Sequence, residues 1–474
     1  MSWSGVSHGI VIVSLFLGSS GFEQSKPNPQ SFRPVELFQE VWQLCLDYFY
    51  SPAQAPPDWR ALRAKYRPMV EKTESLEESS AAINMMLDEL KTSHTHLYTR
   101  ADWEYYDLLD IFKAAFDEKI KEFFPDGRVT YQNIGIFTQR IHGKTFVKSV
   151  LEGGPAFKAG IMTGDEICSV DGKGYDPVKS FAGKKKVIVR IQRKADPNSV
   201  KDIKVVPERD TAGERYFSAM EASVRSIKAS GFRIGYIHVW SLTREQYYLQ
   251  LLKEIQSGRI KDADALILDL RDGWGGANSY YLSPFDPAVP TEVPSEDGKN
   301  KTIDFKWRKP VVFLINEGTR SGKETLAYAF KYLKLGKLVG TTTAGADVSG
   351  RAFLLKGGCL LELSVKRRQP SAAPAPSGQI PDSPQSPFLF LMQHPEAIEG
   401  KGVVPDVIVG FPIEYAQGHD PQLAAAIQVG IESAKSSNLR VNQVPGRYTE
   451  PHENLDGFAV NLVSTTSGYY VTDP

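Results

Sequence analysis

The pattern of apolar and polar residues changes twice along the chain. Apolar residues at three- and four-residue spacing predict an amphipathic helix over residues 35–48 and a second helix over 76–90. From about residue 232, apolar runs alternate with amphipathic segments. The predicted strands are 234–239, 265–270, 311–315 and 338–340, and the predicted helices are 247–260, 324–335 and 421–436. This alternation predicts an α/β core built on a parallel or mixed sheet.

Between these regions, residues 128–208 hold short β-rich runs separated by glycine turns. The succession Gly153–Ile161, Gly164–Ile167 and Asp171-Gly172 resembles a PDZ domain. The resemblance implies a carboxylate-binding loop, whose backbone N–H groups cap a peptide C-terminus. The residues assigned to this peptide-binding loop are Ile134, Gly135, Ile136 and Phe137.

The first residues predict a targeting segment. Gly9–Leu17 is an apolar run followed by small residues, too short for a bilayer span of about 20 residues. Its length is typical of a secretory signal peptide, so residues 1–25 are set apart and a periplasmic or secreted location is expected. The alternative is a buried strand at the start of the fold.

Composition narrows the classes of partner. The 474 residues carry 56 Lys+Arg and 56 Asp+Glu, so a net charge of zero gives no reason to expect nucleic acid or an anionic membrane. The three cysteines, Cys45, Cys168 and Cys359, form no CxxC pair, which argues against a disulfide framework and a cysteine zinc site. No metal and no cofactor are predicted, and no stable membrane span is expected.

Two glycine-containing segments follow predicted strands. In Asp269–Gly276 the glycines allow a sharp turn whose N–H groups can stabilise an oxyanion, although an ordinary strand-to-helix turn explains the same pattern. In Asn316–Glu324, Ser321 lies where a helix begins, a suitable place for a nucleophile. A simple helix N-cap is the alternative for this serine.

Six segments, taken in order, resemble the C-terminal processing peptidases and the tricorn-core serine peptidases. They are Leu87–Thr95, the PDZ-like region, Ile267–Gly276, Asn316–Glu324, Val339–Ala346 and Glu399–Val407. The resemblance implies a multi-domain α/β (α+β) protein with a mixed-sheet core of the ClpP/crotonase type, an inserted β-rich PDZ domain and a helical N-terminal region. The expected boundaries are 1–25 (signal peptide), 30–110 (helical region), 128–208 (PDZ), 213–440 (peptidase core) and 441–474 (tail of unknown role).

The resemblance also assigns roles. Ser321 aligns with the family nucleophile, but Ala346 stands where the processing peptidases have their general-base lysine. A methyl group cannot accept a proton, and Lys323 lies only two residues from Ser321 on a helix, so it is expected to face away. A serine–lysine dyad is therefore not expected.

The tricorn branch uses a histidine instead, within a Thr-Ser-His motif that matches Thr92–His94. The resemblance implies His94 as base, with Ser93 and Glu399 orienting the imidazole. Glu396 is the alternative to Glu399, because a Pro-rich segment blurs the alignment. The oxyanion hole would combine the N–H of Gly322 with that of Gly275 or Gly276. A structural role for His94 is the competing interpretation.

Together these features predict a serine endopeptidase that cleaves unfolded or C-terminally exposed polypeptides. Polypeptide C-terminal tails are the expected partners, and a homo-oligomer is compatible with the sequence. Three alternatives stay open: an inactive homologue that binds peptides, a serine–lysine peptidase inactivated by substitution at Ala346, and a carrier of small apolar ligands.

Overall fold

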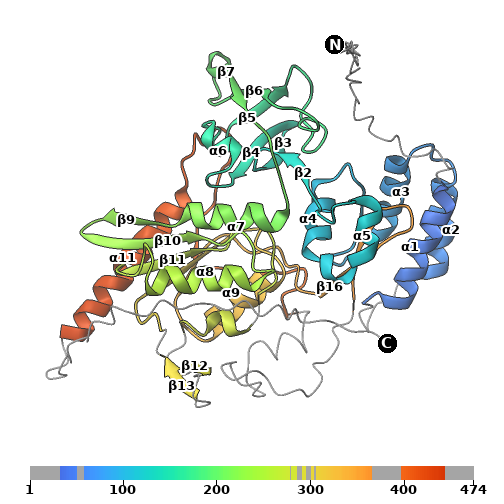
Figure 1. Ribbon diagram of the computed structural model, residues 1–474. Coiled ribbons are helices and arrows are strands. Elements are labelled where there is room, and N and C mark those ends of the chain that lie inside the picture. The colour runs from blue at the N-terminus through green and yellow to red at the C-terminus, as the bar shows by residue number, and fades with distance from the viewer. Residues whose placement is uncertain are drawn as a thin grey trace, which may run out of the picture.

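The computed structural model describes residues 33–50, 58–277, 279–285, 291–294, 300–303, 306–365 and 397–442. The predicted signal peptide, the Pro-rich segment 369–387 and nearly all of the predicted tail lie outside these residues. The architecture is mixed α/β, as the sequence predicts, and it comprises a helical N-terminal unit, a five-stranded unit and a core built on a six-stranded sheet (Figure 1).

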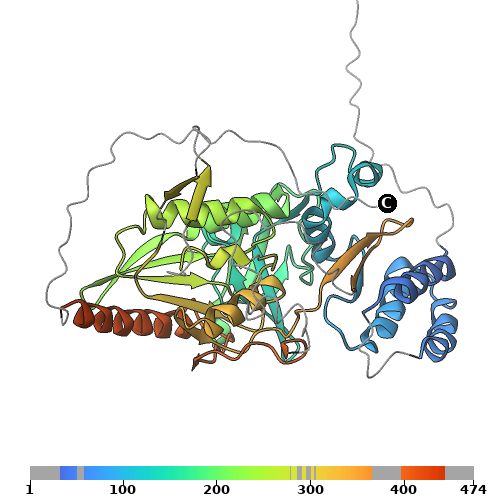
Figure 2. The same ribbon diagram turned by 90° about the horizontal axis from the view of Figure 1, so that it is seen from below.

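The N-terminal unit is a small helical bundle, and two strands from much later in the chain pack against it. Its helices are α1 (Pro34–Tyr48), α2 (Trp59–Val70) and α3 (Leu76–Asp88). Strand β1 (His96–Tyr98) pairs with β17 (Leu360–Ser364), which pairs in turn with β16 (Gly350–Leu354). Leu361 and Leu363 join the apolar core formed by α1, α2 and α3, so residues near 360 complete a unit that begins at residue 34. Figure 2 shows the orange strands of β16 and β17 beside this bundle.

Short helices and a five-stranded unit follow. The helices are α4 (Trp103–Ile111), η1 (Lys113–Ala115) and α5 (Asp117–Phe123). The five-stranded unit, residues 131–210, contains the antiparallel sheet β3 (Ile136–Ile141), β4 (Lys144–Val150), β5 (Glu166–Val170), β6 (Val187–Gln192) and β7 (Val200–Val205), with α6 (Pro155–Lys158) and η2 (Pro197–Ser199). Strands β2 (Tyr131–Asn133) and β8 (Glu208–Asp210) pair at its base. It has an apolar core of its own.

The core sheet has the order β18-β15-β14-β11-β10-β9. Its strands are β9 (Arg225–Ala229), β10 (Phe232–His238), β11 (Ala265–Asp269), β14 (Val311–Ile315), β15 (Lys337–Gly340) and β18 (Val407–Ile408). All neighbours are parallel except β9 and β10. Strands β11 and β14 are buried along their whole length, which explains their uniformly apolar sequences.

Helices cover both faces of this sheet. Helices α7 (Ala212–Ser223), α8 (Glu245–Gln256) and α9 (Gly322–Tyr332) share one apolar cluster with one face, and α11 (Pro421–Asn442) packs on the other (Figure 1). Helix η3 (Ser279–Leu282) and the hairpin of β12 (Thr291–Pro294) and β13 (Asn300–Ile303) lie between β11 and β14 in the sequence. Because β10, β11 and β14 are parallel, the loops that follow them meet at one edge of the sheet.

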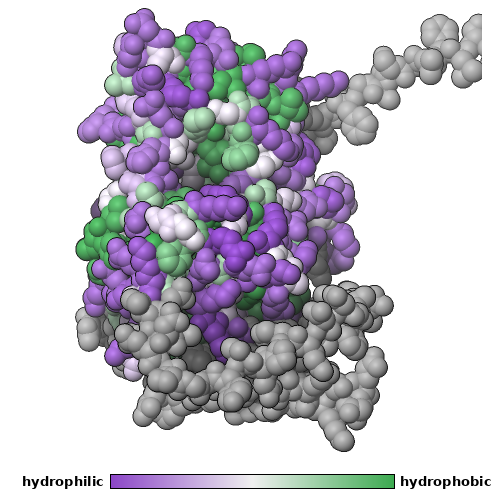
Figure 3. Space-filling view, turned by 90° about the vertical axis from the view of Figure 1, so that its left-hand side faces the viewer, coloured by the Kyte–Doolittle hydropathy of each residue, from purple (hydrophilic) through white to green (hydrophobic). Residues whose placement is uncertain are grey.

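Figure 3 views the molecule from the side, with the five-stranded unit above the core and mostly hydrophilic side chains over both. A cleft of about 510 Å³ lies between the two units. Lys148 and Ser149 of β4 both bind the Asp272 carboxylate at 2.8 Å, and His238 at the end of β10 meets Glu152 at 3.2 Å. These polar contacts link the five-stranded unit to the loops at the edge of the core sheet.

Candidate active site

Ser321 lies at the turn between β14 and α9 in a conformation that few serines adopt. Its φ of 55° and ψ of −134° place it in the left-handed half of conformational space. Its N–H donates to the carbonyl of Ala346 at 2.9 Å and to Glu324 Oε2 at 3.2 Å. The side chain stays partly exposed at the N-terminus of α9, where the helix dipole favours a developing negative charge.

The glycines predicted for the oxyanion hole lie against this turn. A Cβ built on Gly275 would be 2.7 Å from the Cβ of Ser321 and 2.9 Å from the N of Gly322. A Cβ on Gly322 would be 2.9 Å from the N of Gly276. Only glycine permits this approach, so the backbone of Gly275 and Gly276 lies close against Ser321 and Gly322.

His94 also occupies a positive-φ turn, at 49°, just after α3. Its Nδ1 lies 2.9 Å from Ser93 Oγ, and Ser93 Oγ donates to Glu399 Oε2 at 3.0 Å. A serine hydroxyl carries a single hydrogen, which here points to the carboxylate. Ser93 therefore accepts from Nδ1–H, and this tautomer leaves a lone pair on Nε2 of His94.

Glu399 ties this histidine turn to the segment that holds Ser321. Its Oε1 accepts from the Ser93 N–H at 2.8 Å, and its Oε2 accepts from the N–H groups of Asp347 (2.8 Å) and Val348 (2.9 Å). The preceding residue, Ala346, accepts the Ser321 N–H through its carbonyl. Hydrogen bonds through Ser93 and Glu399, together with the covalent link between Asp347 and Ala346, thus connect the His94 turn to Ser321. The alternative residue Glu396 lies outside the described residues.

Glu324 is a residue of this site that the sequence analysis missed. It is fully buried, and its carboxylate accepts from Gly345 N and Ala346 N, each at 2.7 Å, and from Thr343 Oγ1 at 2.5 Å. Burial raises the pKa of this carboxyl above its usual range. Glu324 holds the 343–346 turn against Ser321. The Ser-x-x-Glu spacing at the helix start is the signal that could have found it.

Neither Ala346 nor Lys323 supplies a free amine to the serine. Position 346 has only a methyl group, and the Nζ of Lys323 donates to the carbonyls of Trp240 (3.1 Å) and Asp272 (2.8 Å). Burial lowers the pKa of Lys323 to about 7. The sequence analysis expected Lys323 to face away from Ser321, and its amine binds these two carbonyls.

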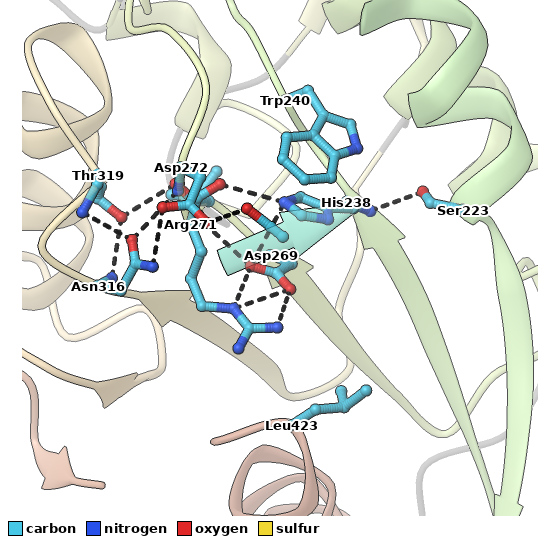
Figure 4. Close-up of polar contacts among 12 residues, drawn as sticks. Ser223, His238, Trp240, Asp269, Arg271, Asp272, Asn316, Thr319 and Leu423 are labelled. Atoms are coloured by element: carbon cyan, nitrogen blue, oxygen red, sulfur yellow. Dashed lines mark hydrogen bonds and ion pairs between the residues drawn. The ribbon is translucent and has the colours of Figure 1, made fainter. Parts of the chain in front are cut away.

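A second layer of side chains fixes the loops that follow β11 and β14 (Figure 4). Asn316 Nδ2 donates to Asp272 Oδ1 and Asn316 Oδ1 accepts from the Asp272 N–H, both at 3.1 Å. Thr319 Oγ1 donates to the carbonyl of Leu270 at 3.0 Å. These bonds join the two strand exits, so the glycine loop and the serine turn are held as one assembly.

The loop predicted to bind peptide C-termini faces the core rather than solvent. Phe137 packs against Trp103, with ring centroids 5.3 Å apart, and stacks on Trp240 at 5.7 Å. Ile134 is buried, and Gly135 has the positive φ of 72° that its turn requires. The cavity that these residues line with Ile136 holds only about 20 Å³, too little for a peptide terminus in this conformation.

No metal site or membrane helix is found in the described part of the chain. There, no group of three or more His, Cys, Asp or Glu side chains is arranged to hold a metal ion. Among the same residues, no helix combines the length and the apolar character needed to cross a bilayer.

Two protein-family models match parts of the chain. Residues 34–88 match the tricorn protease C1 domain and residues 233–382 match peptidase family S41. The chain is 25% identical over 415 residues to the tricorn protease of Thermoplasma volcanium. The aligned region covers 83% of this chain and 36% of that protein. It is 26% identical over 297 residues to the carboxy-terminal processing protease CtpA of Bacillus subtilis, covering 57% of this chain and 61% of that protein.

Among solved structures, a photosystem II D1 C-terminal processing protease aligns with a TM-score of 0.46 at 18% identity, covering 82% of this chain and 98% of the other. The chain spans little more than a third of the length of the tricorn relatives it matches. The core of the chain is therefore similar to peptidase family S41 and its N-terminal unit to the tricorn C1 domain, and the chain as a whole is similar to tricorn and C-terminal processing proteases.

Proposed function

We propose that this protein is a serine endopeptidase in which Ser321 is the nucleophile and His94 the general base. The supporting observation is the Ser93 hydroxyl, which accepts from His94 Nδ1 and donates to Glu399. In the tautomer that this pair of bonds favours, Nε2 is the nitrogen of the imidazole that can act as a base. Ala346 excludes the lysine base of the processing peptidases at that position.

The reaction proceeds by acyl transfer. Ser321 Oγ attacks the scissile carbonyl while its proton passes to His94 Nε2, and the N–H groups of Gly322 and Gly276 bind the oxyanion that forms. His94 then donates the proton to the leaving amine. Water, activated by the same histidine, releases the acyl group from Ser321 and regenerates the serine.

The substrates we propose are polypeptides with unfolded or exposed C-terminal segments. The names of the relatives support peptide-bond hydrolysis and C-terminal processing. The apolar run at residues 9–17 supports a periplasmic or secreted location.

Ser321→Ala tests the nucleophile. Hydrolysis of a casein-derived fluorogenic peptide should fall by ~10⁴–10⁶-fold, and labelling by a serine-reactive fluorophosphonate should vanish. Ser257→Ala, which changes an exposed serine at the end of α8, is the matched control and should keep both activities. An unlabelled wild-type protein would instead support the inactive peptide-binding homologue.

We further propose that the five-stranded unit receives substrate C-termini at residues 134–137 once Phe137 leaves the aromatic side chains of the core. Titration with an apolar-ended peptide and its C-terminal amide tests this proposal. The free carboxylate should bind more tightly, and Trp103→Ala should strengthen binding because it removes one of the rings that holds Phe137. Equal affinities of the acid and the amide in both proteins would exclude a carboxylate receptor.

A further inference from the structure

Lys323 is a fully buried lysine at the second position of α9, two residues beyond Ser321. Within the described ranges, no carboxylate lies at ion-pair distance from its Nζ. The amine donates instead to two backbone carbonyls, those of Asp272 at 2.8 Å and Trp240 at 3.1 Å. Burying an amine without a carboxylate partner costs free energy, so we expect the Lys323 side chain to have a role that offsets this cost.

The two carbonyls belong to the segments that shape the glycine loop. Asp272 lies in the loop that follows β11, and Trp240 lies in the loop that follows β10; Figure 4 shows the two residues near neighbouring strand ends. The Trp240 carbonyl also accepts from the N–H of Trp274 at 2.9 Å. The amine of Lys323 therefore binds both of the segments, at residues 240 and 272, that lie beside the turn leading to Gly275 and Gly276.

Close packing makes the position of this turn critical. Gly273 has a φ of 67°, and a Cβ there would lie 1.9 Å from the Trp240 carbonyl oxygen. A Cβ on Gly275 would lie 2.7 Å from the Cβ of Ser321, closer than an ordinary contact. A small shift of the turn would change the direction of the Gly276 N–H, and oxyanion donors act only over a narrow range of geometry.

We propose that Lys323 is a positioning residue for the oxyanion hole, holding the 272–276 loop against the nucleophile helix through its two carbonyl contacts. This role rests on the proposed peptidase function, since it assigns Gly276 as an oxyanion donor. Lys323 touches no reacting atom. Its pKa of about 7 means that it is largely neutral in mildly alkaline solution, where two N–H donors remain available.

The test compares three variants of the full chain. Lys323→Met keeps an unbranched apolar side chain, one atom shorter, and removes the donors, whereas Lys323→Gln keeps an amide donor on a side chain of the same length as Met. Lys331→Met is the matched control, because Lys331 is on the same helix and donates at 2.7 Å to the carbonyl of Val404, away from the loop.

Lys323→Met should lower kcat by about 10- to 100-fold with KM nearly unchanged, because only transition-state stabilisation is lost. A peptide aldehyde, which forms a tetrahedral oxyanion on Ser321, should lose affinity by a similar factor. Lys323→Gln should recover part of the loss, and Lys331→Met should behave as wild type.

Hydrogen exchange of the peptide covering 270–277 gives a readout that does not depend on activity. It should accelerate in Lys323→Met and stay unchanged in Lys331→Met. Unchanged exchange in Lys323→Met overturns the positioning role, whatever the activity. A loss of turnover as large as that of Ser321→Ala with unchanged exchange would make Lys323 the base instead. If the wild type hydrolyses nothing, the proposed function fails, while hydrogen exchange still decides whether Lys323 holds the loop.

Discussion

The two halves of the proposed catalytic site are stabilised in different ways. Ser321 and His94 both occupy positive-φ turns, which cost free energy that neighbouring contacts must offset. The serine turn follows a buried strand, begins a helix and is held by Glu324, three residues further along. The histidine turn follows a helix end and depends on Glu399, 306 residues away in the sequence.

This difference separates local from long-range organisation. A strand–turn–helix segment inside a packed sheet positions the serine even if the N-terminal unit is displaced. The histidine reaches its place only when three segments meet: the turn at 92–95, the loop at 346–348 and the turn that carries Glu399. Catalysis should therefore be lost through the histidine half under milder perturbations than those that disturb the serine half.

The strongest way to test the histidine half is His94→Ala. Removing the base should reduce kcat/KM by ~10⁴–10⁶-fold, and the wild-type rise of kcat/KM with pH through about 6–7 should disappear, because only the neutral imidazole can accept the proton. Ala346→Lys is the companion variant. A harmless His94→Ala together with a large gain in Ala346→Lys would identify a disabled serine–lysine peptidase and contradict the histidine mechanism.

Glu399→Gln should have an intermediate effect that distinguishes the two halves. All the contacts of this carboxylate are with N–H and O–H donors, so an amide NH₂ would oppose one of them. We expect kcat to fall about 10²-fold. This is less than the roughly 10⁴-fold loss seen when a triad carboxylate bonded directly to the histidine is replaced, because Ser93 lies between Glu399 and His94. Fluorophosphonate labelling of Ser321 should become slow but still reach completion. Glu432→Gln, an exposed change on α11, is the control. Wild-type kinetics in Glu399→Gln would remove this residue from the mechanism.

The smallest expected effect is a pH dependence of the free energy of unfolding that comes from Lys323, close to the serine turn. Burial disfavours the charged form of Lys323 and lowers its pKa from the ordinary 10.5 to about 7. Between these values the unfolded chain binds one more proton than the folded one, so stability due to this group rises with pH, by about 1.4 kcal/mol per pH unit, and levels off above 10.5. Urea unfolding of the wild type and of Lys323→Met at pH 7, 8 and 9 measures this pH-dependent part of the free energy of unfolding. As the pH rises, the free energy of unfolding of the wild type should increase relative to that of the variant. A difference between the two proteins that does not change with pH would contradict the shifted pKa.

Much of the serine half could be predicted from sequence. The apolar run 311–315 is β14, and the helix predicted from residue 324 begins at Gly322, so the serine lies at the strand-to-helix junction. Periodicity and turn glycines report on the backbone within a few residues, which is the range that this turn needs. The Ser-x-x-Glu spacing even contained the signal for Glu324.

By itself, then, the sequence determined the alternating strands and helices of the core, the place of Ser321 at a helix start and the absence of a lysine at 346. Only the tertiary structure decided that β16 and β17 would leave the core to complete the N-terminal unit, and that Lys323 would bind two carbonyls. It also decided that Phe137 would pack on Trp240. The physical reason is that such contacts join segments far apart in the chain, often through backbone carbonyls that every residue carries, so no residue pattern records them.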